Sequence, residues 1–162
     1  MPLIRTWTAG SIHEISVAKE IDLGQGRRAV FTSWDDGGIN STRAISEGGE
    51  YLPVYKVQNY LTISSPYGQP EGEGWYDHGS GAPLYVEQFD GVLFRHHFIS
   101  WAGDYNGTET ATVIVMDSPK TVSVLWKSDF TRIYFLAGCL VLFIGIIVLL
   151  VKRGTIQLRR SK

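Results

Sequence analysis

The chain has 162 residues, enough for one or two small domains, and 44% of them are hydrophobic, which excludes a low-complexity or disordered sequence. Its formal net charge of −1 hides an asymmetry: residues 1–130 hold nine Lys and Arg against sixteen Asp and Glu, whereas residues 131–162 hold six basic residues and no acidic one. A basic face for nucleic acid is therefore not expected, and a single cysteine excludes an internal disulfide.

Four short runs predict a first β module at 1–58. They are rich in β-branched and aromatic residues and are separated by glycine-containing turns. The runs are GSIHEISV (10–17), RRAVFTSW (27–34), STRAISE (41–47) and EYLPVYKV (50–57). The Gly48-Gly49 pair suits a two-residue turn, so the last two runs are expected to form a hairpin.

A second β module is predicted at 59–130 from runs of the same kind. A strand at 60–65 leads through a Gly- and Pro-rich turn to Trp75. The following runs are GAPLYVE (81–87), VLFRHHFISW (92–101), TATVIVM (110–116) and TVSVLW (121–126). The turn sequence DSPK (117–120) predicts a hairpin between the last two. The expected fold is mainly β, with two small sandwich-like or grasp-like modules that support one another.

Matching landmarks indicate that the two modules are copies of one repeat. They recur in the same order, about 66 to 71 positions apart: Trp7 with Trp75, Trp34 with Trp101, Asn40 with Asn106, and Tyr55 with Trp126. Recurrence favours core packing for the tryptophans over a glycan-binding platform. The expected repeat core is Trp7, Trp34, Trp75, Trp101 and Trp126.

Strand alternation and the missing start of the first copy give two further expectations. Alternation places Trp101 on the same face as Ile99 and Phe98 on the opposite face. The second copy begins with the strand at 60–65, but only MPLIRT precedes Trp7 in the first. The first copy should therefore have an unpaired sheet edge, which a protein partner or a longer parent chain would complete.

The run at 133–151 contains nineteen residues without a charge and predicts a transmembrane helix at 131–152, about 28 Å long over the uncharged part. Gly138 and Gly145 are candidate helix-packing positions. Cys139 lies in the span and is expected to pack or face lipid. The tail at 153–162 is basic, so the positive-inside rule predicts a cytoplasmic tail, an extracytoplasmic head and a single-pass plasma-membrane protein.

The head orientation has support and one difficulty. Asn40 and Asn106 begin glycosylation sequons in predicted turns, as expected of an extracytoplasmic head. The N-terminal residues 1–16 contain no apolar run of the signal-peptide kind. Three alternatives stay open: a removed leader, a C-terminal piece of a longer chain, or the opposite orientation.

Catalytic, metal and cofactor chemistry is not expected. His96 and His97 are adjacent, and neighbouring strand residues point to opposite faces, so they are poorly placed to share a metal. Asp35-Asp36 and Asp104 follow the repeated Trp, but turns this short offer Ca²⁺ few oxygen ligands. No nucleophile elbow or phosphate-binding loop is present in the sequence. The expectation is a non-enzymatic protein without a cofactor or small-molecule substrate.

Residues 7–127 resemble the divergent β-rich repeats of bacterial and archaeal surface proteins, which are distantly similar to the internalin B-repeat. That pattern is a strand, a turn ending in Gly-Trp, an F-x-x-W strand, and a closing M-D-x-x-K-T-V-x-x-x-W segment. The second copy matches at Gly74, Trp75, Phe98, Trp101, Met116, Asp117, Lys120, Thr121, Val122 and Trp126. The first copy departs, because Trp7 lacks the preceding Gly and Tyr55 replaces the closing Trp.

The resemblance implies a non-catalytic extracytoplasmic spacer or interaction module beside a C-terminal membrane anchor, commonly in archaeal surface proteins. The expected function is thus a structural or interaction module at the cell surface. One alternative is an accessory subunit of a membrane complex, held by its helix and capping the complex with its β domain. Another is a glycan-binding surface module.

Overall fold

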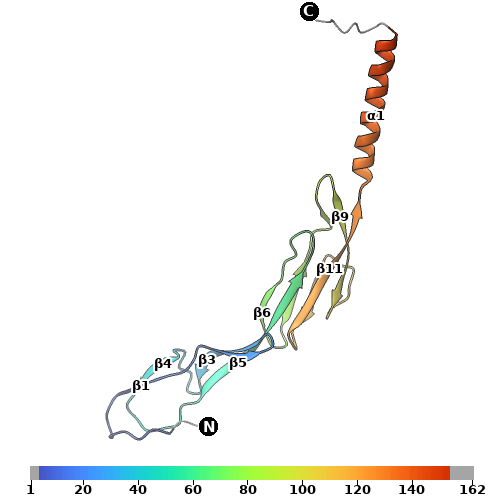
Figure 1. Ribbon diagram of the computed structural model, residues 1–162. Coiled ribbons are helices and arrows are strands. Elements are labelled where there is room, and N and C mark those ends of the chain that lie inside the picture. The colour runs from blue at the N-terminus through green and yellow to red at the C-terminus, as the bar shows by residue number, and fades with distance from the viewer. Residues whose placement is uncertain (1–3, 154–162) are drawn as a thin grey trace, which may run out of the picture.

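The computed structural model describes residues 4–153 as an elongated β head followed by one C-terminal helix (Figure 1). The prediction of a mainly β chain with a single C-terminal apolar helix is confirmed. The elements are β1 His13–Ser16, β2 Glu20–Gly24, β3 Arg27–Trp34, β4 Thr42–Ile45, β5 Pro53–Ser64, β6 Gly74–Asp77, β7 Gly81–Tyr85, β8 Phe89–Asp90, β9 Arg95–Gly103, β10 Ala111–Val115, β11 Lys120–Asp129 and α1 Thr131–Lys152.

One long sheet runs through the head, with a two-stranded sheet beside each half. The long sheet has the order β2-β3-β5-β11-β9-β8, and β6 pairs with β5. The small sheets are β1-β4 and β7-β10. In Figure 1, β1 and β4 lie at the end of the head farthest from α1, and β11 leads directly into the helix.

The strand registers of the two copies coincide, which is the structural counterpart of the sequence repeat. Ile15 on β1 lies opposite Arg43 on β4, as Leu84 on β7 lies opposite Thr112 on β10. The register of the β2-β3 pair likewise matches that of the β8-β9 pair. The register of the β3-β5 pair matches that of the β9-β11 pair. In this last pair, Phe31↔Tyr55 corresponds to Phe98↔Trp126.

A β-bulge recurs at the same place and corrects the predicted strand faces. The register skips Thr32 in the first copy and Ile99 in the second. A bulge inserts one residue and reverses the alternation beyond it. Phe98 and Trp101 are therefore both buried and Ile99 is exposed, so the prediction that Trp101 shares its face with Ile99 was wrong. The ring centroids are 5.8 Å apart for Phe98 and Trp101, as they are for Phe31 and Trp34.

The two predicted hairpins do not form. β4 pairs with β1 rather than with β5, and β10 pairs with β7 rather than with β11. In each copy the strands on either side of the turn belong to different sheets. The Gly48-Gly49 and DSPK segments therefore carry the chain from one layer to the other, as in a sandwich.

The core is concentrated in the second copy. Ten buried apolar residues come from both of its layers: Leu61, Ala82, Leu84, Val86, Phe98, Trp101, Ile114, Met116, Val122 and Val124. The described part of the first copy buries only Ala29, Trp34 and Ile45 among its apolar side chains. Burial of apolar surface is the main stabilising term, so we expect the second copy to be the more stable half of the head.

The opening segment explains the difference between the copies. The second half of β5 runs parallel to β11, with Leu61 opposite Lys120 and Ile63 opposite Val122. β6 pairs with the opposite edge of β5, so that Leu61 lies between Lys120 and Gly74. The described part of the first copy has no counterpart of either strand. The predicted boundary between 58 and 59 falls inside β5, so one strand closes the first copy and opens the second.

Candidate functional site

The candidate interaction site is the open edge of β5 in the first copy, at 53–57. The carbonyl of Val57 accepts a hydrogen bond of 2.9 Å from the N–H of His78, at the end of β6. Backbone groups two residues apart point to the same side of a strand. Tyr55 therefore directs its N–H and C=O to that side, where the described residues supply no pairing strand. This edge can bind another extended segment through main-chain hydrogen bonds.

Exposed apolar side chains accompany the open edge. Leu52 is 50% exposed and Val54 is 44% exposed. The second copy differs because its parallel strand contributes Leu61, which is fully buried, and Ile63, which packs against the core. The first copy therefore lacks the apolar residues that such a strand would add.

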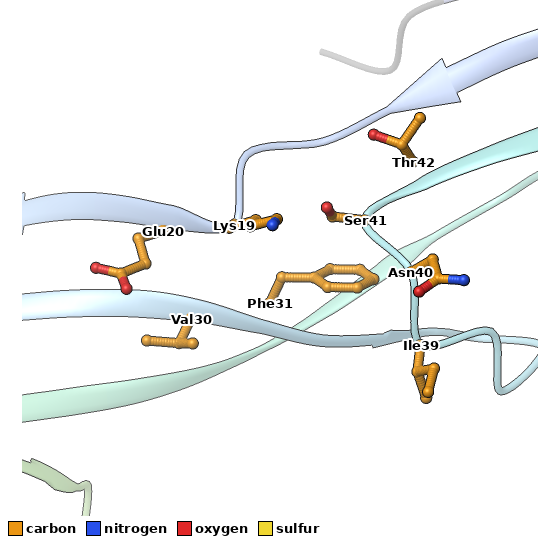
Figure 2. A pocket seen from close by; sticks show the side chains of 8 residues that line it. All are labelled: Lys19, Glu20, Val30, Phe31, Ile39, Asn40, Ser41 and Thr42. Carbon is orange, nitrogen blue, oxygen red and sulfur yellow. The ribbon is translucent and has the colours of Figure 1, made fainter.

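An open hollow of about 570 Å³ lies in the same copy, between β3 and the segment before β4 (Figure 2). The ring of Phe31 points from β3 toward Asn40 and Ser41 in this view. The other lining residues are Lys19, Glu20, Val30, Ile39 and Thr42. The hollow is open to solvent, and both polar and apolar side chains line it. It therefore adds to the incomplete packing of the first copy.

The five tryptophans do not share one environment. Trp34 and Trp101 are 3% and 1% exposed, and their indole N–H groups donate to the carbonyls of Asn40 and Glu109 at 2.8 and 2.9 Å. Trp126 is half-buried against the core of the second copy. Trp7 is 46% exposed, so its expected place in the core was wrong.

Trp7 and Trp75 differ because only Trp75 lies on a paired strand. Trp7 precedes β1 and stacks on the ring of His13, at a centroid distance of 4.3 Å. Trp75 lies on β6, against Tyr60 and under the guanidinium of Arg28, 4.4 Å from the ring centroid. The guanidinium covers one face of Trp75 and Trp101 is buried, which weighs against a glycan platform built on these two.

Polar contacts join the copies beside Trp75. Lys56 and Gln58 on β5 both donate to the carboxylate of Asp77 on β6, at 2.8 and 2.7 Å. These two hydrogen bonds, first that of Lys56, hold the pKa of Asp77 below its usual value. Together with the Arg28–Trp75 cation–π contact, they couple the first copy to the second.

The acidic residues after each repeated Trp have a structural role. Asp35 exchanges two hydrogen bonds with Leu52, one through its backbone N–H and one through its carboxylate, at 2.8 and 3.2 Å. Asp104 makes the same pair of bonds with Thr121, at 3.0 and 2.7 Å. These contacts hold the strand that closes each copy, and they use carboxylate oxygens that a Ca²⁺ site would require.

His96 and His97 lie near the start of β9, and the two sequons lie in turns between strands. His96 stacks on Tyr67, whereas His97 faces Phe89 and Asp129, so the pair points to opposite faces as expected. Within residues 4–153, no group of three or more potential metal ligands occurs. Asn40 and Asn106 are exposed in equivalent turns, and glycosylation at either remains a prediction.

α1 is long and apolar enough to cross a membrane, and none of it is buried against the head. Its 22 residues span about 33 Å. Gly138 and Gly145 have open space beside them, so helix packing there remains a prediction. The exposed Cys139 lies between them on the helix. The tail at 154–162 lies outside the described residues.

A polar junction precedes the helix. The hydroxyl and backbone N–H of Thr131 both donate to the carboxylate of Asp129. These bonds, aided by His97, lower the pKa of Asp129 to about 2. The carboxylate therefore stays ionised at neutral pH and accepts the first backbone N–H of α1.

Comparison with protein-family models, with curated proteins and with solved structures finds no match to this chain.

Proposed function

We propose that this chain is a non-enzymatic, single-pass membrane protein whose β-repeat head lies outside the cytoplasm and binds an extended segment of another component at the cell surface. The observation that carries the proposal is the open edge of β5 at 53–57 beside an incompletely packed first copy. A head tethered by its C-terminus presents this edge at its membrane-distal end.

The charge distribution supports the orientation. All six basic residues at 131–162 flank the apolar span, and five of them follow Val151. The positive-inside rule then assigns the tail to the cytoplasm and the head to the opposite side. The sequons at Asn40 and Asn106 are exposed and agree with that assignment.

The second copy supplies a template for the bound segment. Because the registers of the copies coincide, a parallel strand would pair near 49–52, as the second half of β5 pairs with β11. Its alternate apolar side chains would cover the first copy, as Leu61 and Ile63 cover the second. A preceding module of the same kind or a separate partner chain would supply such a segment. The resemblance to surface-protein repeats supports this spacer and interaction role.

An accessory subunit of a membrane complex is the second candidate. Space beside Gly138 and Gly145 would admit a neighbouring helix. In that case the head would cap the complex, and the open edge would be one of its contacts.

Photo-crosslinking from equivalent positions tests the interaction edge. A photo-reactive amino acid is placed at Val54 in one variant and at Leu125 in another, in the full chain in its native membrane. These residues are register equivalents, opposite Ser33 and Ser100, and are 44% and 48% exposed. Val54 is expected to give a protein adduct, which mass spectrometry then identifies, and Leu125 is not. Equal yields, or no adduct from Val54, would contradict the proposed edge.

A further inference from the structure

The β8-β9 loop presents three consecutive exposed apolar residues beside the membrane helix. Val92, Leu93 and Phe94 are 75%, 52% and 59% exposed. In Figure 1 the loop before β9 rises to the level at which α1 begins. Burying three apolar side chains would gain several kcal/mol, so leaving them in water is costly. An exposed apolar patch of this kind is typical of a surface that contacts another protein or a membrane.

Two contacts fix this loop to the start of α1. The guanidinium of Arg132, the second residue of the helix, donates to the carbonyl of Val92 at 3.1 Å. The rings of Phe94 and Phe130 meet edge to face, with centroids 6.4 Å apart. The loop is also tight, since Gly91 has a φ of 80° and a Cβ there would overlap the carbonyl of Phe94. The apolar tip is therefore held at the depth of the first helical turn.

The first copy provides an internal comparison. Its equivalent turn, at 22–27, reads DLGQGR and contains one apolar residue, Leu23. That turn faces the second copy, where Pro119 and Tyr60 lie close to Gly26. An apolar tip is thus no requirement of the repeat fold. In the first copy this turn contacts the second copy, which comes next in the chain. In the second copy the equivalent loop contacts α1, which comes next and enters the bilayer.

We propose that residues 92–94 insert into the interfacial region of the leaflet in which α1 begins, forming a second membrane contact that sets the tilt of the head. Leucine and phenylalanine suit the headgroup–acyl boundary. Arg132 uses one donor on Val92 and has others for lipid phosphate, and Tyr134, 74% exposed, lies two residues farther along the helix. This inference rests on the membrane anchor assigned to α1 under the proposed function.

Site-specific fluorescence tests the contact in the full chain. The sole cysteine is removed by Cys139→Ala, and an environment-sensitive label is attached through Leu93→Cys, Leu23→Cys or Phe143→Cys in separate variants. Each is reconstituted in phosphatidylcholine vesicles with quencher lipids of shallow or deep position. The label at 93 is expected to show blue-shifted emission and loss of intensity with the shallow quencher. The label at 143 should lose intensity with the deep quencher. The label at 23 should lose intensity with neither quencher.

The outcomes separate this inference from the anchor itself. Quenching at 143 without quenching at 93 overturns the loop contact and leaves the anchor intact. No quenching at either position overturns the anchor and the inference that rests on it. Quenching at 93 and 23 alike would mean that the head lies flat on the bilayer, which also contradicts a contact specific to the loop.

Discussion

Replacing Trp101 with alanine is expected to destabilise the second copy by about 3–5 kcal/mol, the usual cost of removing a large aromatic from a core. Trp101 is 1% exposed, packs on Phe98, and donates its indole N–H to the carbonyl of Glu109. A module of this size has a stability of only a few kcal/mol, so the variant should be largely unfolded. Denaturant titration of the full chain in detergent, followed by near-ultraviolet circular dichroism, measures the change.

The other repeated tryptophans provide matched controls for Trp101. Trp34→Ala should cost less than Trp101→Ala, because the first copy buries three apolar residues in its described part and the second buries ten. Trp7→Ala should change the free energy of unfolding by no more than about 0.5 kcal/mol, as for an ordinary surface substitution. Equal effects of Trp7→Ala and Trp101→Ala would contradict the assignment of the core to the second copy.

Two arginines in the middle of α1 are expected to release the chain from the membrane. Each arginine near the helix centre costs about 2.5–3.5 kcal/mol of insertion free energy, so Leu142→Arg with Ile146→Arg costs about 5–7 kcal/mol. Both residues are exposed, and no part of the apolar span is buried against the head, so the head could not shield the new charges. Alkaline carbonate extraction followed by flotation measures the membrane-bound fraction.

The control keeps the helix apolar at the same positions. Leu142→Ala with Ile146→Ala should remain in the membrane fraction, because alanine removes apolar surface without introducing charge. If the double arginine variant also remained with the membrane after carbonate treatment, α1 would not be the anchor.

The local strand signals were sufficient to predict the fold class but not the pairing. RRAVFTSW (27–34) coincides with β3, and the apolar run coincides with α1. The hairpins at 41–57 and 110–126 were wrong, because the partner of a strand is set by the packing of two layers and not by the turn that follows it. The bulge at Thr32 and Ile99 was likewise invisible in the alternation, since a skipped residue has no signature of its own.

The candidate site was partly predictable because the chain contains its own comparison. Aligning the two copies predicted a missing opening strand, and in the described residues the edge of β5 is open at that place. The β8-β9 loop was missed, because Val92, Leu93 and Phe94 directly precede β9 and were predicted as part of the same strand. Their position beside Arg132 depends on tertiary structure alone.

The central claim is a β-repeat head held outside the cytoplasm by α1, and labelling of single cysteines in intact cells tests it most directly. In a Cys139→Ala background, Ser118→Cys places a thiol in the exposed β10-β11 turn, and Ser161→Cys places one in the basic tail. With a membrane-impermeant maleimide, the head thiol should be labelled in intact cells and the tail thiol only after permeabilisation. Labelling of the tail but not the head in intact cells would contradict the account.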